Sequence, residues 1–130
     1  MKILLDTQVF IWIVEADHHL GKDAKRILKD LSNDLYISYF SFYEMSIKAS
    51  IGKLSYDTSI LDDLSDMGIE LILPDTSELK SYKVFNPDNK DPFDNMLMNI
   101  AIRDNLCLMT SDKKILDTQV DGFKHLDATK

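Results

Sequence analysis

Four acidic side chains are spaced so that one fold could bring them to a single cation: Asp6, Glu44, Asp94 and Asp112. Carboxylates packed together repel one another and cannot all stay ionised without a counter-charge. A hard divalent cation supplies that charge, and a set of oxygen ligands suits Mg²⁺ or Mn²⁺. Such an ion polarises a phosphoryl oxygen and generates a hydroxide-like nucleophile from bound water. These residue types therefore indicate hydrolysis of a phosphodiester bond.

Each acid also has a purely structural explanation. Ser41 and Glu44 have the spacing of a capping box, in which the glutamate reaches back to the N–H of the capping residue. Asp91 has the position of a helix N-cap with Pro92 at the first helical position, which leaves Asp94 in the first turn beside the helix dipole. The other two acids could likewise complement helix starts. Capping accounts for any one acid, but it does not predict that all four lie together.

The spacing of apolar residues predicts the strands and helices that position these acids. Short apolar runs without polar alternation predict strands covered on both faces, at residues 3–5, 35–37, 69–73 and 106–109. Helical spacing predicts helices at 7–15, 22–31, 42–51, 58–67, 76–82 and 92–104, the second of them with Leu31 on its apolar stripe. Strands alternating with helices predict an α/β fold with a parallel sheet. At least three of the four acids follow predicted strands, on the side where such sheets form their sites.

Composition and charge narrow the class of protein. The chain has 130 residues, 45% hydrophobic and 28% charged, which predicts one globular domain over 1–130. The apolar N-terminal run is too short for a signal peptide, and no stretch approaches the roughly 20 apolar residues of a membrane span. The lone Cys107 suits a reducing compartment, so we expect a cytoplasmic protein without membrane attachment.

The net charge is −7, from 15 basic and 22 acidic residues, which argues against a protein that coats DNA. It does not exclude an enzyme with a local basic rim. Solvated helix faces explain most of the candidates for such a rim, which are Lys22, Lys25, Arg26, Lys48, Lys53, Lys113 and Lys114.

The motifs together resemble the PIN-domain nuclease family, and within it the VapC-like toxins of type II toxin–antitoxin systems. The matching segments, over roughly residues 2–116, are Leu4-Leu5-Asp6-Thr7, residues 41–48 with Gly52-Lys53-Leu54, Asp91-Pro92-Phe93-Asp94 and Thr110-Ser111-Asp112. The resemblance implies a PIN-like three-layer sandwich and an endoribonuclease that depends on Mg²⁺ or Mn²⁺. It also implies an RNA substrate such as tRNA or rRNA, a small antitoxin that occludes the site, and a homodimer.

By position, the resemblance implies a catalytic and metal-binding set of Asp6, Glu44, Asp94 and Asp112. Asp91 is a weaker candidate ligand, because capping explains it better. Thr110 or Ser111 would orient metal-bound water or phosphate. Lys48 lies one helical turn after Glu44, so it would steady that carboxylate or face the RNA backbone.

Two residues depart from the family pattern. Gln8 stands where many members have histidine, and Asn95 stands where many have arginine after Asp-Pro-Phe-Asp. Neither change removes a proposed ligand. The loss of the arginine bears instead on RNA contact or on a local ion pair.

Other classes of function fit less well. A haloacid-dehalogenase-type phosphatase would need aspartate where Gln8 stands, and a receiver module would need paired acids near the N-terminus. A DNA-binding regulator is disfavoured by the charge and by the lack of a helix-turn-helix pattern. The three histidines, His18, His19 and His125, lack zinc-ligand spacing. The alternative that stays open is a catalytically weak or inactive PIN-fold interaction module, although the four intact acids argue against it.

Overall fold

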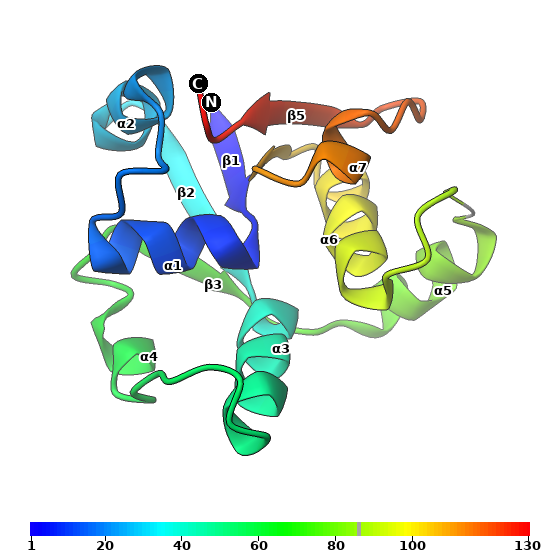
Figure 1. Ribbon diagram of the computed structural model, residues 1–130. Helices are drawn as coiled ribbons and strands as arrows, with labels where there is room; N and C mark the ends of the chain where they lie inside the picture. Colours follow the sequence, from blue (N-terminus) through cyan, green and yellow to red (C-terminus); the bar gives the residue numbers. More distant parts are fainter. Residues whose placement is uncertain (86) are drawn as a thin grey trace.

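A parallel sheet forms the centre of the computed structural model (Figure 1), which describes residues 1–85 and 87–130. Within those residues the sheet has five strands: β1 (Lys2–Leu5), β2 (Asp34–Ser38), β3 (Ile69–Ile72), β4 (Cys107–Thr110) and β5 (Lys124–Asp127). Their order across the sheet is β3-β2-β1-β4-β5, and every neighbouring pair is parallel. The chain therefore builds outward from β1 to one edge and then returns to build from β4 to the other. This reversal makes the carboxyl ends of β1 and β4 a topological switch point.

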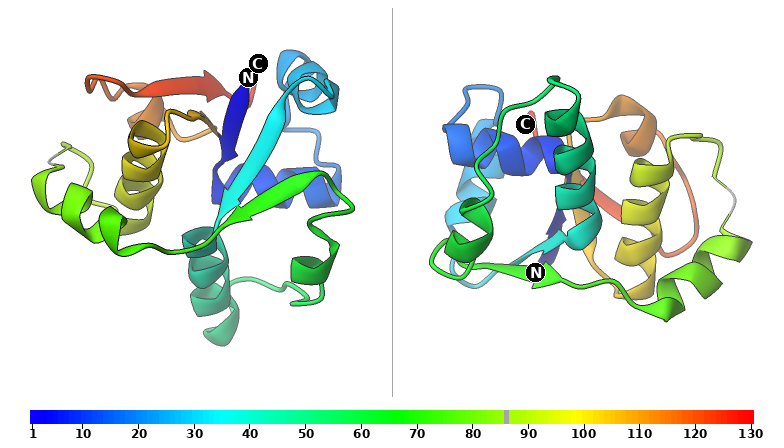
Figure 2. Two further views of the ribbon diagram at one scale, coloured as in Figure 1. Left: turned by 180° about the vertical axis from the view of Figure 1, so that it is seen from behind. Right: turned by 90° about the horizontal axis from the view of Figure 1, so that it is seen from below.

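Helices cover both faces of the sheet, as Figure 2 shows for α1 and α6 on opposite sides. The described helices are α1 (Thr7–Glu15), α2 (Lys22–Lys29), α3 (Tyr39–Ser50), α4 (Ile60–Asp63), α5 (Thr76–Val84), α6 (Pro92–Arg103) and α7 (Lys113–Leu116). Strand β1 alternates between two buried cores, because Ile3 and Leu5 pack with residues of α1 and α2 while Leu4 packs with residues of α6. The predicted α/β sandwich is confirmed. None of the described helices is long and apolar enough to cross a membrane.

The structure departs from the predicted elements where the apolar signal is weak. The prediction missed β5 because only one of the four side chains in Lys124–Asp127 is apolar. This strand lies at the edge of the sheet and pairs with β4 alone. It also missed the single-turn helix α7. Helix α2 ends at Lys29 rather than at residue 31, so the predicted apolar position Leu31 is 99% exposed. Helix α4 is shorter than the range predicted for it.

Candidate active site

The predicted acidic residues line one cleft of about 440 Å³. Its lining consists of Asp6, Thr7, Gln8, Ile11, Glu44, Met45, Lys48, Lys53, Leu54, Asp91, Asp94, Ser111 and Asp112. The cleft lies where β1 and β4 end, which is the switch point of the sheet, between the later turns of α3 and the start of α6. The fold therefore gathers all five predicted carboxylates from four separate parts of the chain. Of the predicted auxiliary residues, Lys48 and Ser111 also line the cleft.

Asp6 is held by a buried threonine on the neighbouring strand. The Oγ1 of Thr110 donates a hydrogen bond of 2.6 Å to Asp6 Oδ2 and accepts one of 3.0 Å from the Asp112 N–H. Thr110 is fully buried and Asp6 is 7% exposed. Asp6 has the N-cap position of α1 but its side chain makes no capping hydrogen bond, so capping does not explain this acid. Thr110 thus joins the ends of β1 and β4 and fixes one carboxylate of the cleft.

Burial raises the pKa of Asp6 above its ordinary value. The hydrogen bonds from Thr110 and from the Thr7 backbone oppose that change, while the charges of Glu44 and Asp112 add to it. The carboxylates of the cleft therefore act on one another through the low-dielectric interior.

Helix α3 begins earlier than the sequence pattern indicated, and the alternative explanation of Glu44 as part of a capping box is wrong. Ser38, at the end of β2, is the N-cap, because its Oγ accepts a 3.1 Å hydrogen bond from the Phe40 N–H. Ser41 is consequently inside the helix, where its Oγ accepts a 2.9 Å hydrogen bond from Thr7 Oγ1. Glu44 lies in the second turn and has no capping role there, so its carboxylate is free to line the cleft.

Two lysines form a basic rim beside Glu44. Lys48 Nζ lies 3.2 Å from Glu44 Oε2, which confirms the predicted contact one helical turn away. Gly52 adopts the left-handed φ of 75° after α3 ends, and the Lys53 N–H donates to the Lys48 carbonyl at 2.8 Å. This reversal of the chain brings Lys53 to the same cleft. The other lysines suggested for a rim do not line it.

The start of α6 follows the sequence prediction closely. Asp91 is the N-cap, with Pro92 at the first helical position, and its Oδ1 accepts hydrogen bonds from the N–H groups of Phe93 (2.9 Å) and Asp94 (3.2 Å). Asp94 lies in the first turn and accepts a 3.2 Å hydrogen bond from Asn89 Nδ2. Asn89 was not identified from the sequence, because nothing in a motif shows which loop residue will reach a carboxylate.

Asp94, like Asp6, has a carboxyl whose pKa is raised by its surroundings. Burial and the charge of Asp91 raise its pKa from 3.8 to about 7, against the hydrogen bond from Asn89. The charges of Asp6 and Asp112 add to the increase. A carboxyl whose ionisation is opposed by three neighbouring acids is one that a cation would stabilise.

Asp112 serves both the fold and the cleft. It is the N-cap of α7, where its Oδ1 accepts a 2.8 Å hydrogen bond from the Lys114 N–H. Capping therefore explains Asp91 and Asp112 but neither Asp6 nor Glu44.

The donor set fits a hard divalent cation. The acidic ligands of the cleft are all carboxylates, and no three of them bring ligand atoms within 4.8 Å of one another in the part of the chain described. An ion in this cleft would therefore have at most two of these carboxylates as direct ligands and would hold waters at its remaining positions, an arrangement that is usual for Mg²⁺. The residues present therefore fit such an ion.

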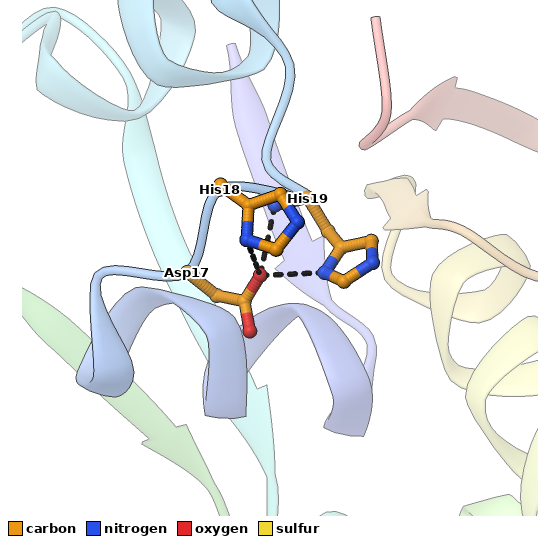
Figure 3. Close-up of side chains that lie close together, drawn as sticks. All are labelled: Asp17, His18 and His19. Atoms are coloured by element: carbon orange, nitrogen blue, oxygen red, sulfur yellow. Dashed lines mark hydrogen bonds and ion pairs between the residues drawn. The ribbon is translucent and has the colours of Figure 1, made fainter.

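A second group of potential ligands lies away from the cleft, after the end of α1 (Figure 3). Asp17 Oδ1 accepts a 2.8 Å hydrogen bond from the His19 N–H and lies 2.6 Å from His19 Nδ1 and 3.5 Å from His18 Nδ1. These three ligand atoms lie within 4.8 Å of one another, which the sequence spacing did not predict. Hydrogen bonds within this exposed turn account for the arrangement, and the site is at the opposite end of α1 from Asp6.

Comparison with known proteins shows what this chain is similar to. The structure is similar to a chain of VapBC2 from Rickettsia felis, solved bound to a DNA fragment from their promoter. That match has a TM-score of 0.67 and 15% identity, and it covers 97% of this chain and 98% of the other. It is also similar to a chain of VapBC-1 from nontypeable Haemophilus influenzae, with a TM-score of 0.63, 22% identity and full coverage of both chains. No curated protein matches the sequence.

At these identities the two structures establish a shared fold. The sequence itself matches the model of the PIN domain over residues 3–120, a range that contains every carboxylate of the cleft and nearly the whole chain. This chain belongs to the PIN domain family.

Proposed function

We propose that this chain is a Mg²⁺- or Mn²⁺-dependent endoribonuclease, a VapC-like toxin that a small antitoxin inhibits. The observation that carries the proposal is the convergence of four carboxylates, Asp6, Glu44, Asp94 and Asp112, in one cleft. PIN domains are generally metal-dependent nucleases, and this chain keeps acids at all four positions.

Each element of the cleft has a defined role in this proposal. Asp6, Glu44 and Asp94 would be the main metal-binding carboxylates, directly or through bound water, and Asp112 would be the fourth acid. When bound, the ion would activate water and stabilise the charge that develops on the phosphate. Ser111 lines the cleft where it could orient water or phosphate.

The basic rim indicates on which side of the acids the RNA substrate would bind. Lys53 lines the cleft, and Lys48 is half-exposed although it pairs with Glu44. Both are placed to contact backbone phosphates of RNA, which carry no sequence information. We therefore place the strand on the α3 side of the acids, with tRNA or rRNA as the candidate substrate.

The partners in this proposal are an antitoxin and a second copy of the chain. The two similar structures described above are of VapBC proteins, which supports an antitoxin as the partner. Helix α3 also exposes large apolar side chains beyond the cleft, at Tyr39, Tyr43 and Ile47. Such side chains are typical of a surface that another protein covers. We place this toxin in the cytoplasm, where its RNA substrates are.

The test is cleavage of RNA by the purified chain without antitoxin. Total tRNA and rRNA fragments are incubated with Mn²⁺, with Mg²⁺ and with EDTA, and Mn²⁺ binding is measured separately by calorimetry. Asp94→Asn removes a proposed ligand, and Asp121→Asn makes the same charge change at an exposed carboxylate outside the cleft. We expect discrete, metal-dependent cleavage by wild type and Asp121→Asn, and none by Asp94→Asn.

The other outcomes separate the competing explanations. Equal cleavage by Asp94→Asn would identify a contaminating nuclease or a different site. Absence of both cleavage and Mn²⁺ binding would refute the nuclease and favour a PIN-fold interaction module.

A further inference from the structure

Asn95, which departs from the family pattern, is buried beside the proposed metal ligand Asp94. It is 7% exposed, and its Nδ2 donates a 2.8 Å hydrogen bond to the backbone carbonyl of Asn89. Its Oδ1 is buried without a hydrogen-bond partner among the described residues. A buried polar atom left unpaired destabilises the fold. The function of this amide therefore lies in its Nδ2, which holds the loop that precedes α6.

That loop in turn holds Asp94 through Asn89. The Nδ2 of Asn89 donates to Asp94 Oδ2 at 3.2 Å, and its Oδ1 accepts from the Asp91 N–H at 3.0 Å. The backbone carbonyl of Asn89 also accepts the hydrogen bond from Asn95. Asn89 therefore makes three hydrogen bonds, through its amide nitrogen, its amide oxygen and its backbone oxygen. Asn89 is thus fixed at three points, so the direction of its donor toward Asp94 is fixed too.

We propose that Asn89 and Asn95 are positioning residues, through which this chain orients the carboxylate of Asp94 for the divalent cation. The inference rests on the proposed function, because it assumes that Asp94 binds the metal. Asn89 holds Oδ2 of Asp94 and leaves the other oxygen to the cation. Because both amides are neutral, they orient the carboxylate without cancelling its negative charge. A positively charged side chain at position 95 would also neutralise part of the negative charge that the cation needs. The asparagine that replaces the family's arginine avoids this.

The experiment measures Mn²⁺ affinity by calorimetry, with thermal unfolding of each metal-free variant beside it. Groups that orient metal ligands typically contribute about 10- to 100-fold to metal affinity. We expect that loss in Asn89→Ala and in Asn95→Ala. We also expect RNA cleavage by both variants to recover at saturating Mn²⁺, because the ligand itself is intact.

Asn99→Ala is the matched control on the same helix. Asn99 is also a buried amide of α6, and its Nδ2 donates to the backbone carbonyl of Glu78 at 3.1 Å, away from the cleft. It should lower the unfolding temperature as Asn95→Ala does, yet leave Mn²⁺ affinity unchanged. Because Asn95 acts through Asn89, the double variant Asn89→Ala/Asn95→Ala should bind Mn²⁺ no more weakly than Asn89→Ala alone.

Failures of this inference and of the proposed function give different results. If wild type binds Mn²⁺ and both single variants bind it equally well, the positioning role is wrong and the nuclease stands. If Asn99→Ala weakens binding as much as Asn95→Ala, general destabilisation explains the effect and the positioning role is again wrong. If wild type neither binds Mn²⁺ nor cleaves RNA, the proposed function fails and this inference fails with it.

Discussion

The carboxyl of Asp94 links the stability of the metal-free protein to pH. Its pKa is raised from 3.8 to about 7, chiefly by burial and by the charge of Asp91. Between those two values the unfolded chain releases this proton while the folded chain keeps it. A rise in pH from about 4 to about 7 therefore favours the unfolded state progressively, and the destabilisation is complete above about pH 7.

The size of this effect follows from the change in pKa. When the pKa of a group in the folded protein differs by one from its pKa in the unfolded chain, the free energy of unfolding changes by about 1.4 kcal/mol. The change from 3.8 to about 7 would therefore amount to about 4 kcal/mol if the site were fully shielded from water. Asp94 is only half-buried, so solvent screens its charge and we expect about half of that, roughly 2 kcal/mol.

Urea denaturation in EDTA tests the prediction between about pH 4 and about pH 8. Asp94→Asn has nearly the same shape and no proton to release. The free energy of unfolding of this variant, minus that of wild type, should rise by about 2 kcal/mol across the range and then level off. Asp121→Asn should show no such rise, because its carboxylate is exposed. A constant difference between Asp94→Asn and wild type would refute the electrostatic account of the cleft.

Four further substitutions test other parts of the structure. Thr110→Val removes the hydroxyl that holds Asp6, so we expect a loss of about 1–3 kcal/mol in urea denaturation and about tenfold weaker Mn²⁺ binding by calorimetry. Lys48→Met should change the free energy of unfolding by less than about 1 kcal/mol, because the lysine is half-exposed. The salt dependence of RNA affinity, measured by filter binding at several salt concentrations, should show about one phosphate contact fewer. Met98→Ala should lower the free energy of unfolding by about 2–5 kcal/mol, since Met98 is fully buried, whereas Leu31→Ser should change it by less than about 0.5 kcal/mol.

The parts of the site that the sequence predicted are those governed by local rules. Asp6 could be placed because an uninterrupted apolar run ends at it, and sites of parallel sheets form at the carboxyl ends of strands. Asp91 and Asp94 could be placed because the Asp-Pro pair is a strong helix-start signal, which the hydrogen bonds confirm. In both cases a few neighbouring residues determine the geometry.

The parts that were missed depend on contacts between distant residues. Ser38 and Ser41 are both reasonable N-caps for α3, and the choice depends on where β2 stops pairing with its neighbours. Strand β5 forms because β4 offers it an edge, not because its own sequence favours a strand. The contact from Asn89 to Asp94 requires the course of a loop that no periodicity describes.

Four of the five acids of the cleft divide into two groups, while the fifth, Glu44, pairs with Lys48. The division explains how the fold can hold these four together. Asp91 and Asp112 cap helices, so backbone N–H groups stabilise their carboxylates without any ion. Asp6 and Asp94 have raised pKa values because burial opposes their charge, so in the absence of metal they destabilise the fold as they ionise. A cation that binds the folded state alone at 100 times its Kd would stabilise that state by about 2.7 kcal/mol. That gain is of the same size as the roughly 2 kcal/mol expected from Asp94. The fold can therefore tolerate Asp6 and Asp94, because the ligand that they are proposed to bind also offsets the destabilisation that their ionisation causes.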